Sequence, residues 1–402
     1  MYDSINISVM KLIPEDLRKE IEIRIEAVRR HMSKAGADAL LVATNANIYY
    51  TTGRFFRGYV YIPLEGSPVW FVIKPDVYDR EDNVAVIHKP EMIPGKLSEM
   101  GVPLPEAVGL EFDVLTYSEV MRLRALFPQA QPVNGSPALR LARMVKTPYE
   151  LSLMKEDGIH QAEVYRRVTR CYKEDMTDVQ FQVEIERLLR LEGCLGATRV
   201  AGNLMDINLG SVVSGDNADV PGPYDFTMGG AGIDPSLPVG ADGTTLRPGT
   251  TVMIDMNGSF NGYQTDMTRV WSIGEIPELA LRAHKCSVSI LRALESMGTP
   301  GTPVASLYDK AVKIVENENL THYFMGHRQQ ARFIGHGVGI ELNEQPVVMA
   351  RSKDSLLENM TIALEPKFVI PHVGAVGVEN TYVVTPQGLR SITVFPEEIQ
   401  EL

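Results

Sequence analysis

The chain has 402 residues, of which 44% are apolar and 22% are charged, and its formal net charge at pH 7 is −12. This length and composition predict an enzyme-sized protein of two domains with a large buried core. The acidic balance argues against nucleic acid as a partner, because binding of phosphates needs a basic surface.

The first 140 residues contain the elements of an α/β domain. A charged helix is predicted over Pro14–Ala35 and a strand over Ala39–Ala43. Further short apolar runs predict strands. They cover Tyr59–Ile62, Val69–Ile73, Val84–Ile87 and Val108–Glu111. We place the domain boundary within Asn134–Lys146 and divide the chain into residues 1–140 and 141–402.

Two helices open the second domain. The stretch Thr147-Pro148-Tyr149-Glu150 has a threonine cap, a proline at the first helical position and a glutamate three residues after the cap. Thr177, with Gln180 three residues later, repeats the pattern. We therefore expect a helix to begin at each threonine.

Acidic residues then arrive in pairs. Strands are predicted over Val252–Met256 and Thr265–Trp271, joined by a turn rich in Asn and Gly. This hairpin is expected to place Asp255 opposite Asp266, with both side chains on one face.

The same order of elements occurs a second time. Periodic apolar residues predict helices over Leu279–Met297 and Val304–Val315. A second candidate hairpin carries Glu365 and Glu379. Its strands are predicted over Thr361–Phe368 and Val376–Val384. Such an internal near-duplication would wrap two curved half-sheets around one site.

Four carboxylates and one imidazole form the ligand set of a two-metal hydrolytic centre: Asp255, Asp266, His336, Glu365 and Glu379. Asp255 and Glu365 lie inside apolar strands, where a buried carboxylate is costly unless a cation or strong hydrogen bonds neutralise it. Bridging carboxylates can hold two ions about 3.5–4 Å apart, and a water shared between them becomes a hydroxide nucleophile near neutral pH. Oxygen ligands with one imidazole favour manganese, ferrous iron, cobalt or zinc over copper.

The order and context of these five residues resemble the metallopeptidase family with the pita-bread fold, which includes methionine aminopeptidases, Xaa-Pro aminopeptidases and prolidases. The segments Gly36–Val42 and Asn47–Gly53 are similar to the creatinase-type amino-terminal domain of prolidase relatives. The resemblance covers Ile23 to Pro386. It implies an α/β (α+β) fold, with a creatinase-type domain followed by a pita-bread domain of helix pairs and acidic hairpins.

The resemblance also implies roles for the ligands. Asp266 and Glu379 would bridge two divalent ions (Mn, Co, Fe or Zn), Asp255 would hold one ion, and His336 with Glu365 would hold the other. Glu365 is also the first candidate to take a proton from the bridging water. Arg269 is expected to pair with a metal-binding carboxylate and hold it in orientation.

The surroundings of the metal motif depart from the family pattern. Relatives that cleave peptides usually have histidines four residues before and seven after the metal-binding one, where this chain has Arg332 and Asn343. A third usual histidine, ahead of the first metal-binding aspartate, is also missing. Asn343 can hydrogen-bond a carbonyl but cannot transfer a proton. The catalytic candidates are therefore Glu365, Asn343 and Arg332, beside a turn-rich wall predicted over Gly229–Gly240.

Together these features predict a two-metal hydrolase, an Xaa-Pro aminopeptidase or dipeptidase that uses a metal-bridging hydroxide. Two alternatives stay open. The first is a non-peptidase member that acts on another small carboxylate substrate, as a lyase or C–N hydrolase. The second is a binding protein on the same fold that has no turnover. The expected partners are a small peptide or other small molecule and, from the family, a second copy of the chain in a homodimer.

The cysteines and the amino terminus indicate a cytoplasmic protein. Cys171, Cys194 and Cys286 are an odd number without metal-ligand spacing, as expected for reduced thiols. Met1–Glu20 lacks the basic-then-apolar layout of a signal peptide. No apolar run approaches the roughly 20 residues that span a bilayer, so no membrane contact is expected.

Overall fold

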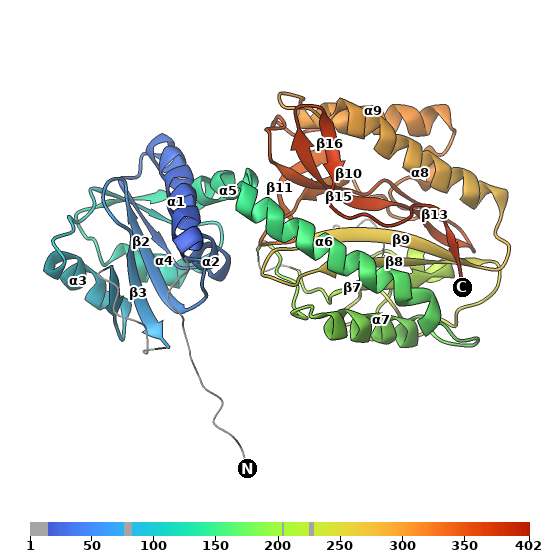
Figure 1. Cartoon of the computed structure of the whole chain (residues 1–402), viewed down its shortest axis with the longest axis horizontal. Coiled ribbons are helices and arrows are strands. Elements are labelled where there is room, and N and C mark those ends of the chain that lie inside the picture. Colours follow the sequence, from blue (N-terminus) through green and yellow to red (C-terminus); the bar gives the residue numbers. More distant parts are fainter. Residues whose placement is uncertain (1–14, 76–82, 203–204, 225–228) are drawn as a thin grey trace, which may run out of the picture. The chain divides into compact units, whose positions relative to one another are not determined.

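The computed structural model describes residues 15–75, 83–202, 205–224 and 229–402. The chain divides into two compact units, residues up to 143 and residues from 144 onward (Figure 1). Residues 1–14 lie outside the described residues, and with them the predicted helix start at Pro14 and most of the segment used to exclude a signal peptide.

The first unit is a six-stranded sheet with helices, in the strand order β4-β3-β2-β1-β5-β6. Its predicted strands are present, and buried side chains such as Leu41, Phe71 and Val108 form its core. The strands are β1 Ala39–Val42, β2 Arg57–Pro63, β3 Val69–Lys74, β4 Val84–Val86, β5 Ala107–Leu110 and β6 Gln131–Asn134. The helices are α1 Glu15–Ala35, α2 Asn45–Thr52, α3 Ile93–Glu99, α4 Tyr117–Arg124 and α5 Ser136–Met144.

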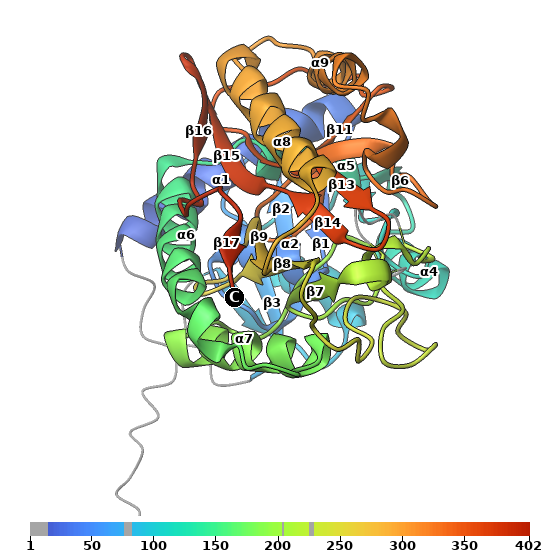
Figure 2. The same cartoon turned by 90° about the vertical axis from the view of Figure 1, so that its right-hand side faces the viewer.

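Two helix pairs flank the sheet of the second unit. Helix α6 spans Pro148–Val168 and α7 spans Asp178–Glu192, and both begin with the predicted capping box. Helix α8 spans Glu278–Met297 and α9 spans Val304–Asn317. In Figures 1 and 2, α6 and α7 lie beside strands β7 (Gly210–Ser214), β8 (Thr250–Gly258) and β9 (Thr265–Ile273). Helices α8 and α9 lie beside strands that come after them in the chain. None of the described helices is long and apolar enough to cross a bilayer.

The second unit is built on a nine-stranded sheet. Seven strands follow the order β11-β10-β12-β15-β9-β8-β7, while β16 pairs with β15 and β17 with β9. The strands are β7 Gly210–Ser214, β8 Thr250–Gly258, β9 Thr265–Ile273, β10 Phe333–Gly337, β11 Glu344–Met349, β12 Thr361–Leu364, β15 Glu379–Thr385, β16 Gly388–Ser391 and β17 Gln400–Glu401. Short 3₁₀ turns lie at Pro90–Met92, Thr169–Cys171, Gly215–Asp219 and Thr321–Tyr323.

The first acidic hairpin forms, but its predicted register was wrong by two residues. Asp255 pairs with Thr268, and Asp266 pairs with Asn257. The connection between β8 and β9 sets this register. Because side chains two residues apart share a face, Asp255 and Asp266 still point to the same side of the sheet.

The second acidic hairpin is interrupted rather than continuous. Strand β12 pairs with β15 in the large sheet, whereas β13 (Lys367–Ile370) and β14 (Gly374–Gly377) form a separate two-stranded sheet. Pro366 lies at the interruption, and proline has no N–H to continue a ladder. The break places Glu365 and Glu379 side by side at its edge, where they are buried.

Candidate metal centre

The five predicted metal ligands come from different strands of the second unit and lie around one site. Asp255 is on β8, Asp266 on β9 and His336 on β10, while Glu365 follows β12 and Glu379 begins β15. All of them except Glu379 line a cavity of about 640 Å³. Glu379 is 1% exposed and is not among the residues that line the cavity. The antiparallel order of the strands thus assembles residues that are far apart in the sequence.

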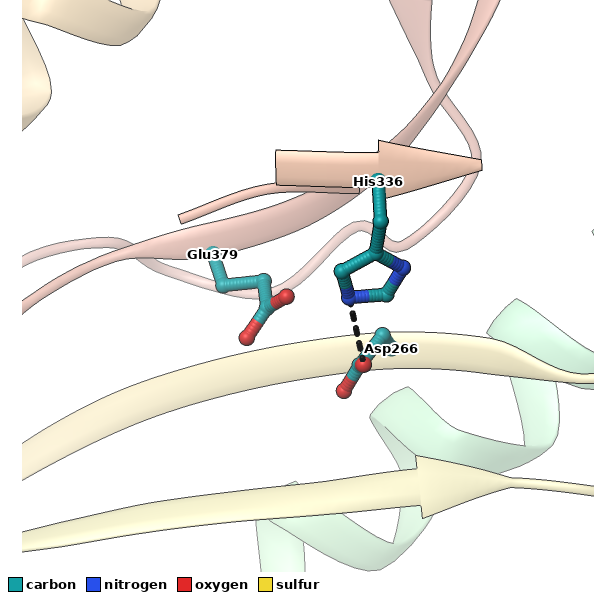
Figure 3. A group of neighbouring side chains, drawn as sticks. All are labelled: Asp266, His336 and Glu379. Carbon is teal, nitrogen blue, oxygen red and sulfur yellow. Dashed lines mark ion pairs between the residues drawn. The ribbon is translucent and has the colours of Figure 1, made fainter. Parts of the chain in front are cut away.

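Three of the five side chains point toward one another (Figure 3). Asp266, His336 and Glu379 each present a ligand atom within 4.8 Å of the other two. His336 Nε2 lies 3.7 Å from Asp266 Oδ2 and 3.6 Å from Glu365 Oε1. This group is compact enough to hold one metal ion.

The imidazole of His336 is oriented for a metal. Its Nδ1 lies 3.0 Å from the main-chain carbonyl oxygen of Gly337, so Nδ1 carries the proton and donates to that oxygen. In the neutral ring the other nitrogen, Nε2, carries a lone pair, and this atom faces oxygens of Asp266 and Glu365. Metal-binding histidines usually donate their second N–H to such an acceptor, which fixes the tautomer.

The sequence did not predict the cation that lies among the carboxylates. Lys367, the third residue of Glu365-Pro366-Lys367, extends its side chain into the cluster from β13 and is fully buried. Its Nζ is 2.8 Å from Asp255 Oδ2 and 2.9 Å from both Glu365 Oε2 and Glu379 Oε2. An ammonium has three hydrogens, so these three carboxylates saturate it.

Burial and charge shift the acid–base behaviour of this cluster. Burial raises the pKa of Asp266 well above its ordinary value, and repulsion from Glu379 and Asp255 raises it further. The pKa of Glu379 is raised by burial and by Glu365. Burial alone would lower the pKa of Lys367, but the neighbouring carboxylates raise it well above its ordinary value. Without a cation, the buried carboxyl groups of Asp266 and Glu379 are therefore harder to ionise than exposed ones.

The two sides of the cluster offer different surroundings to a metal ion. Asp266 Oδ1 and Glu379 Oε1 are buried and have no hydrogen-bond partner among the described residues. Unpaired buried carboxylate oxygens next to a lone pair of His336 fit a divalent cation there. On the side of Asp255, however, the ammonium of Lys367 already contacts the carboxylates that a second ion would need. The residues present fit the ion between Asp266, His336 and Glu379, and do not fit the other.

The remaining candidates lie at the cavity, with different surroundings. Arg332 and Asn343 both line it, as does Val239 of the predicted wall Gly229–Gly240. Asn343 Oδ1 accepts a hydrogen bond from the Ala201 main-chain N–H at 2.7 Å, so its carbonyl oxygen holds a neighbouring loop.

The prediction for Arg269 named the wrong acceptor. Its guanidinium donates to the main-chain carbonyls of Thr268 and Glu379 and to Asn380 Oδ1. Strands β9 and β15 are neighbours, which places these groups within reach of the buried guanidinium. Arg269 thus fixes the backbone that carries Glu379 rather than a metal-binding carboxylate.

Two parts of the chain match models of known protein families. A model described as metallopeptidase family M24 matches residues 152–386. The chain belongs to this family. A model described as the creatinase/prolidase N-terminal domain matches residues 24–145. The predicted family and fold class are therefore confirmed.

Individual relatives are similar over nearly the whole chain. An Xaa-Pro dipeptidase from Pyrococcus horikoshii is 25% identical over 406 residues, covering 97% of this chain and 100% of the relative. An uncharacterized peptidase from Bacillus subtilis is 23% identical over 393 residues, covering 94% and 99%. The structure of an Xaa-Pro dipeptidase from Bacillus anthracis matches with a TM-score of 0.78 at 20% identity, covering 95% of this chain and 100% of the other. Membership in family M24 supports a peptidase with a metal centre.

Proposed function

We propose that this member of family M24 is a metal-dependent hydrolase of small amide substrates that carry a free carboxylate, with Xaa-Pro dipeptides as the first class. The observation that carries the proposal is the group of Asp266, His336 and Glu379 at a cavity of about 640 Å³. Relatives named as Xaa-Pro dipeptidases support the choice of substrate. We take the ion to be manganese, iron, cobalt or zinc.

The shape and lining of the cavity favour a small substrate. Its volume lies within the range of about 300–1,000 Å³ that is usual for small-molecule sites. Apolar side chains line it beside the acidic cluster, and they include Met205, Ile207, Phe333, Val347 and Met349. They can hold the apolar part of a substrate and exclude water from the reacting bond.

The residues of the site then have different roles in hydrolysis. Asp266, His336 and Glu379 would hold the divalent ion, which supplies Lewis acidity and favours ionisation of water near neutral pH. Glu365 would accept the proton from the attacking water, because it lines the cavity while Lys367 holds its Oε2 in place. The amide nitrogen of Asn343 would donate to the substrate carbonyl, since its oxygen is bound to Ala201.

The test of this function is a panel of substrates. The purified chain, loaded with Mn²⁺ or Co²⁺, should release proline from Xaa-Pro dipeptides. Product formation should stop with chelator and return with metal. If peptides give no product while another small carboxylate is turned over, the proposal is replaced by the non-peptidase reading, which Arg332 and Asn343 in place of the usual histidines favour. If nothing is turned over while ligands bind, the chain is a binding protein.

Arg332 is proposed to bind the carboxylate of the substrate. Its side chain is exposed, lines the cavity and makes no hydrogen bond or ion pair with another described residue. Guanidinium groups bind carboxylates through paired hydrogen bonds. We expect Arg332→Ala to raise KM for free Xaa-Pro dipeptides about 10-fold or more, with a small change in kcat.

The control for Arg332 is the substrate itself. Xaa-Pro amides lack the negative charge, so their KM should be nearly the same for the variant and the wild type. Equal KM increases for the acid and the amide would remove Arg332 from carboxylate recognition.

The predicted homodimer stays a prediction and can be checked by light scattering.

A further inference from the structure

We propose that the ammonium of Lys367 takes the place of one of the two metal ions of a dinuclear centre, so that this chain holds a single divalent ion. The inference concerns the same site as the proposed function. It rests on that function only in assuming that the bound ion serves hydrolysis. Its evidence is the position of Lys367 and the ligands that Lys367 leaves open.

Lys367 contacts carboxylates that a second metal ion would need. Its Nζ lies 2.8–2.9 Å from oxygens of Asp255, Glu365 and Glu379. Of the five predicted ligands, Asp255 and Glu379 are two that would hold the ion on this side. An ion bound by the same oxygens would need distances of about 2.0–2.2 Å, and it would lie against the ammonium. The two cations therefore exclude each other.

The fold makes room for the side chain of Lys367. Lys367 is paired with Gly377 in the two-stranded sheet of β13 and β14. A Cβ on Gly377 would lie 2.9 Å from Lys367 Cα and 3.3 Å from Lys367 Cγ, and Gly377 has φ +141°. A side chain at position 377 would thus crowd the start of the lysine side chain. Glycine there leaves the path to the carboxylates open.

The other side of the site keeps ligand atoms that Lys367 does not contact. Asp266 Oδ1 and Glu379 Oε1 have no hydrogen-bond partner among the described residues, and His336 Nε2 faces the same space. Lys367 does not contact Asp266 or His336 in the described hydrogen bonds. Lys367 thus neutralises the side of Asp255 and Glu365, whereas Asp266 and Glu379 Oε1 lack a cation.

Metal stoichiometry tests this inference without any assay of turnover. Wild-type chain equilibrated with excess Mn²⁺ or Co²⁺ and freed of unbound metal should contain one ion per chain by elemental analysis. Its Mn²⁺ form should give the electron paramagnetic resonance spectrum of an isolated ion, without the exchange coupling of a pair. Two ions per wild-type chain, or a coupled pair, would overturn the inference.

A variant makes the test specific to the lysine. Lys367→Ala removes the ammonium and opens its space, so the metal content should rise from one ion per chain to two. Lys146→Ala is the matched control, because Lys146 is also a buried lysine paired with a glutamate, Glu344, at 2.9 Å. It should remain at one ion. A folded Lys367→Ala chain that gains no second ion contradicts the inference, and if this variant does not fold, the wild-type stoichiometry decides alone.

The outcome is separate from that of the proposed function. A chain with one ion that cleaves no peptide would keep this inference and reject the peptidase. A chain with two ions that cleaves Xaa-Pro dipeptides would reject this inference and keep the peptidase.

Discussion

Asp266→Asn should lower metal affinity and turnover by at least about 100-fold each, because loss of groups that merely support metal ligands already costs roughly 10–100-fold. Asp266 is one of the three residues that fit the ion, and its Oδ1 is left without another described partner. The amide keeps the shape of the side chain but removes its charge. Isothermal titration with Mn²⁺ and kinetics on the best substrate of the panel measure the two effects.

Without metal, Asp266→Asn should be more stable than the wild type, although its metal affinity and turnover are lower. Burial and the neighbouring Glu379 raise the pKa of Asp266 in the folded chain. The unfolded chain then loses this proton at a lower pH than the folded chain, so the wild type loses stability as pH rises from the ordinary carboxyl pKa toward the raised one. Asp266→Asn cannot ionise and should be more stable than metal-free wild type in this pH range.

The control for Asp266 is an aspartate outside the site. Asp309 is exposed on α9, and Asp309→Asn should leave metal affinity, turnover and the pH dependence of unfolding unchanged. If Asp266→Asn binds Mn²⁺ as tightly as the wild type does, Asp266 is not a ligand. If its metal-free form is less stable than the metal-free wild type in this pH range, the raised pKa of Asp266 in the folded chain is contradicted.

Local signals allowed most elements of the fold to be predicted from the sequence. The capping residues Thr147 and Thr177 predicted the starts of α6 and α7, because a cap depends on neighbours three residues away. The register of β8 and β9 was wrong because it depends on the conformation of the connecting turn. The break after Glu365 could have been found from Pro366, which cannot continue a ladder.

Some residues of the candidate site could be predicted from the sequence and others could not. The carboxylates and His336 stand out because polar residues interrupt apolar strands, and the structure brings them together. The role of Lys367 depends on which residues face it from other strands. Local sequence patterns do not show such contacts. A signal was nevertheless present, since a lysine that begins the apolar run Lys367–Ile370 beside a predicted buried glutamate needs a partner. Asn343 was predicted only by its distance from His336, and its bond to Ala201 is a contact between distant segments.

Lys367→Met should lower the free energy of unfolding of the metal-free chain by about 3–5 kcal/mol, which is the usual result of removing one partner from a buried ion pair. Methionine replaces the methylene chain of the lysine but is one atom shorter, so it leaves the place of the ammonium open and leaves Asp255, Glu365 and Glu379 without the cation that neutralises them. Urea unfolding of chelator-treated wild type and variant measures the difference.

Divalent metal should reverse much of this loss in a way that distinguishes charge from packing. An ion that binds only the folded chain stabilises it in proportion to the logarithm of its concentration over its Kd. Lys367→Met offers a second place for such an ion, so excess Mn²⁺ should raise its midpoint of thermal unfolding by more than it raises that of the wild type. Lys146→Met, the matched control, also breaks a buried pair, and its loss should persist in the presence of metal. Equal recovery of the two variants with Mn²⁺, or none in Lys367→Met, would show that Lys367 stabilises the fold without standing in for an ion.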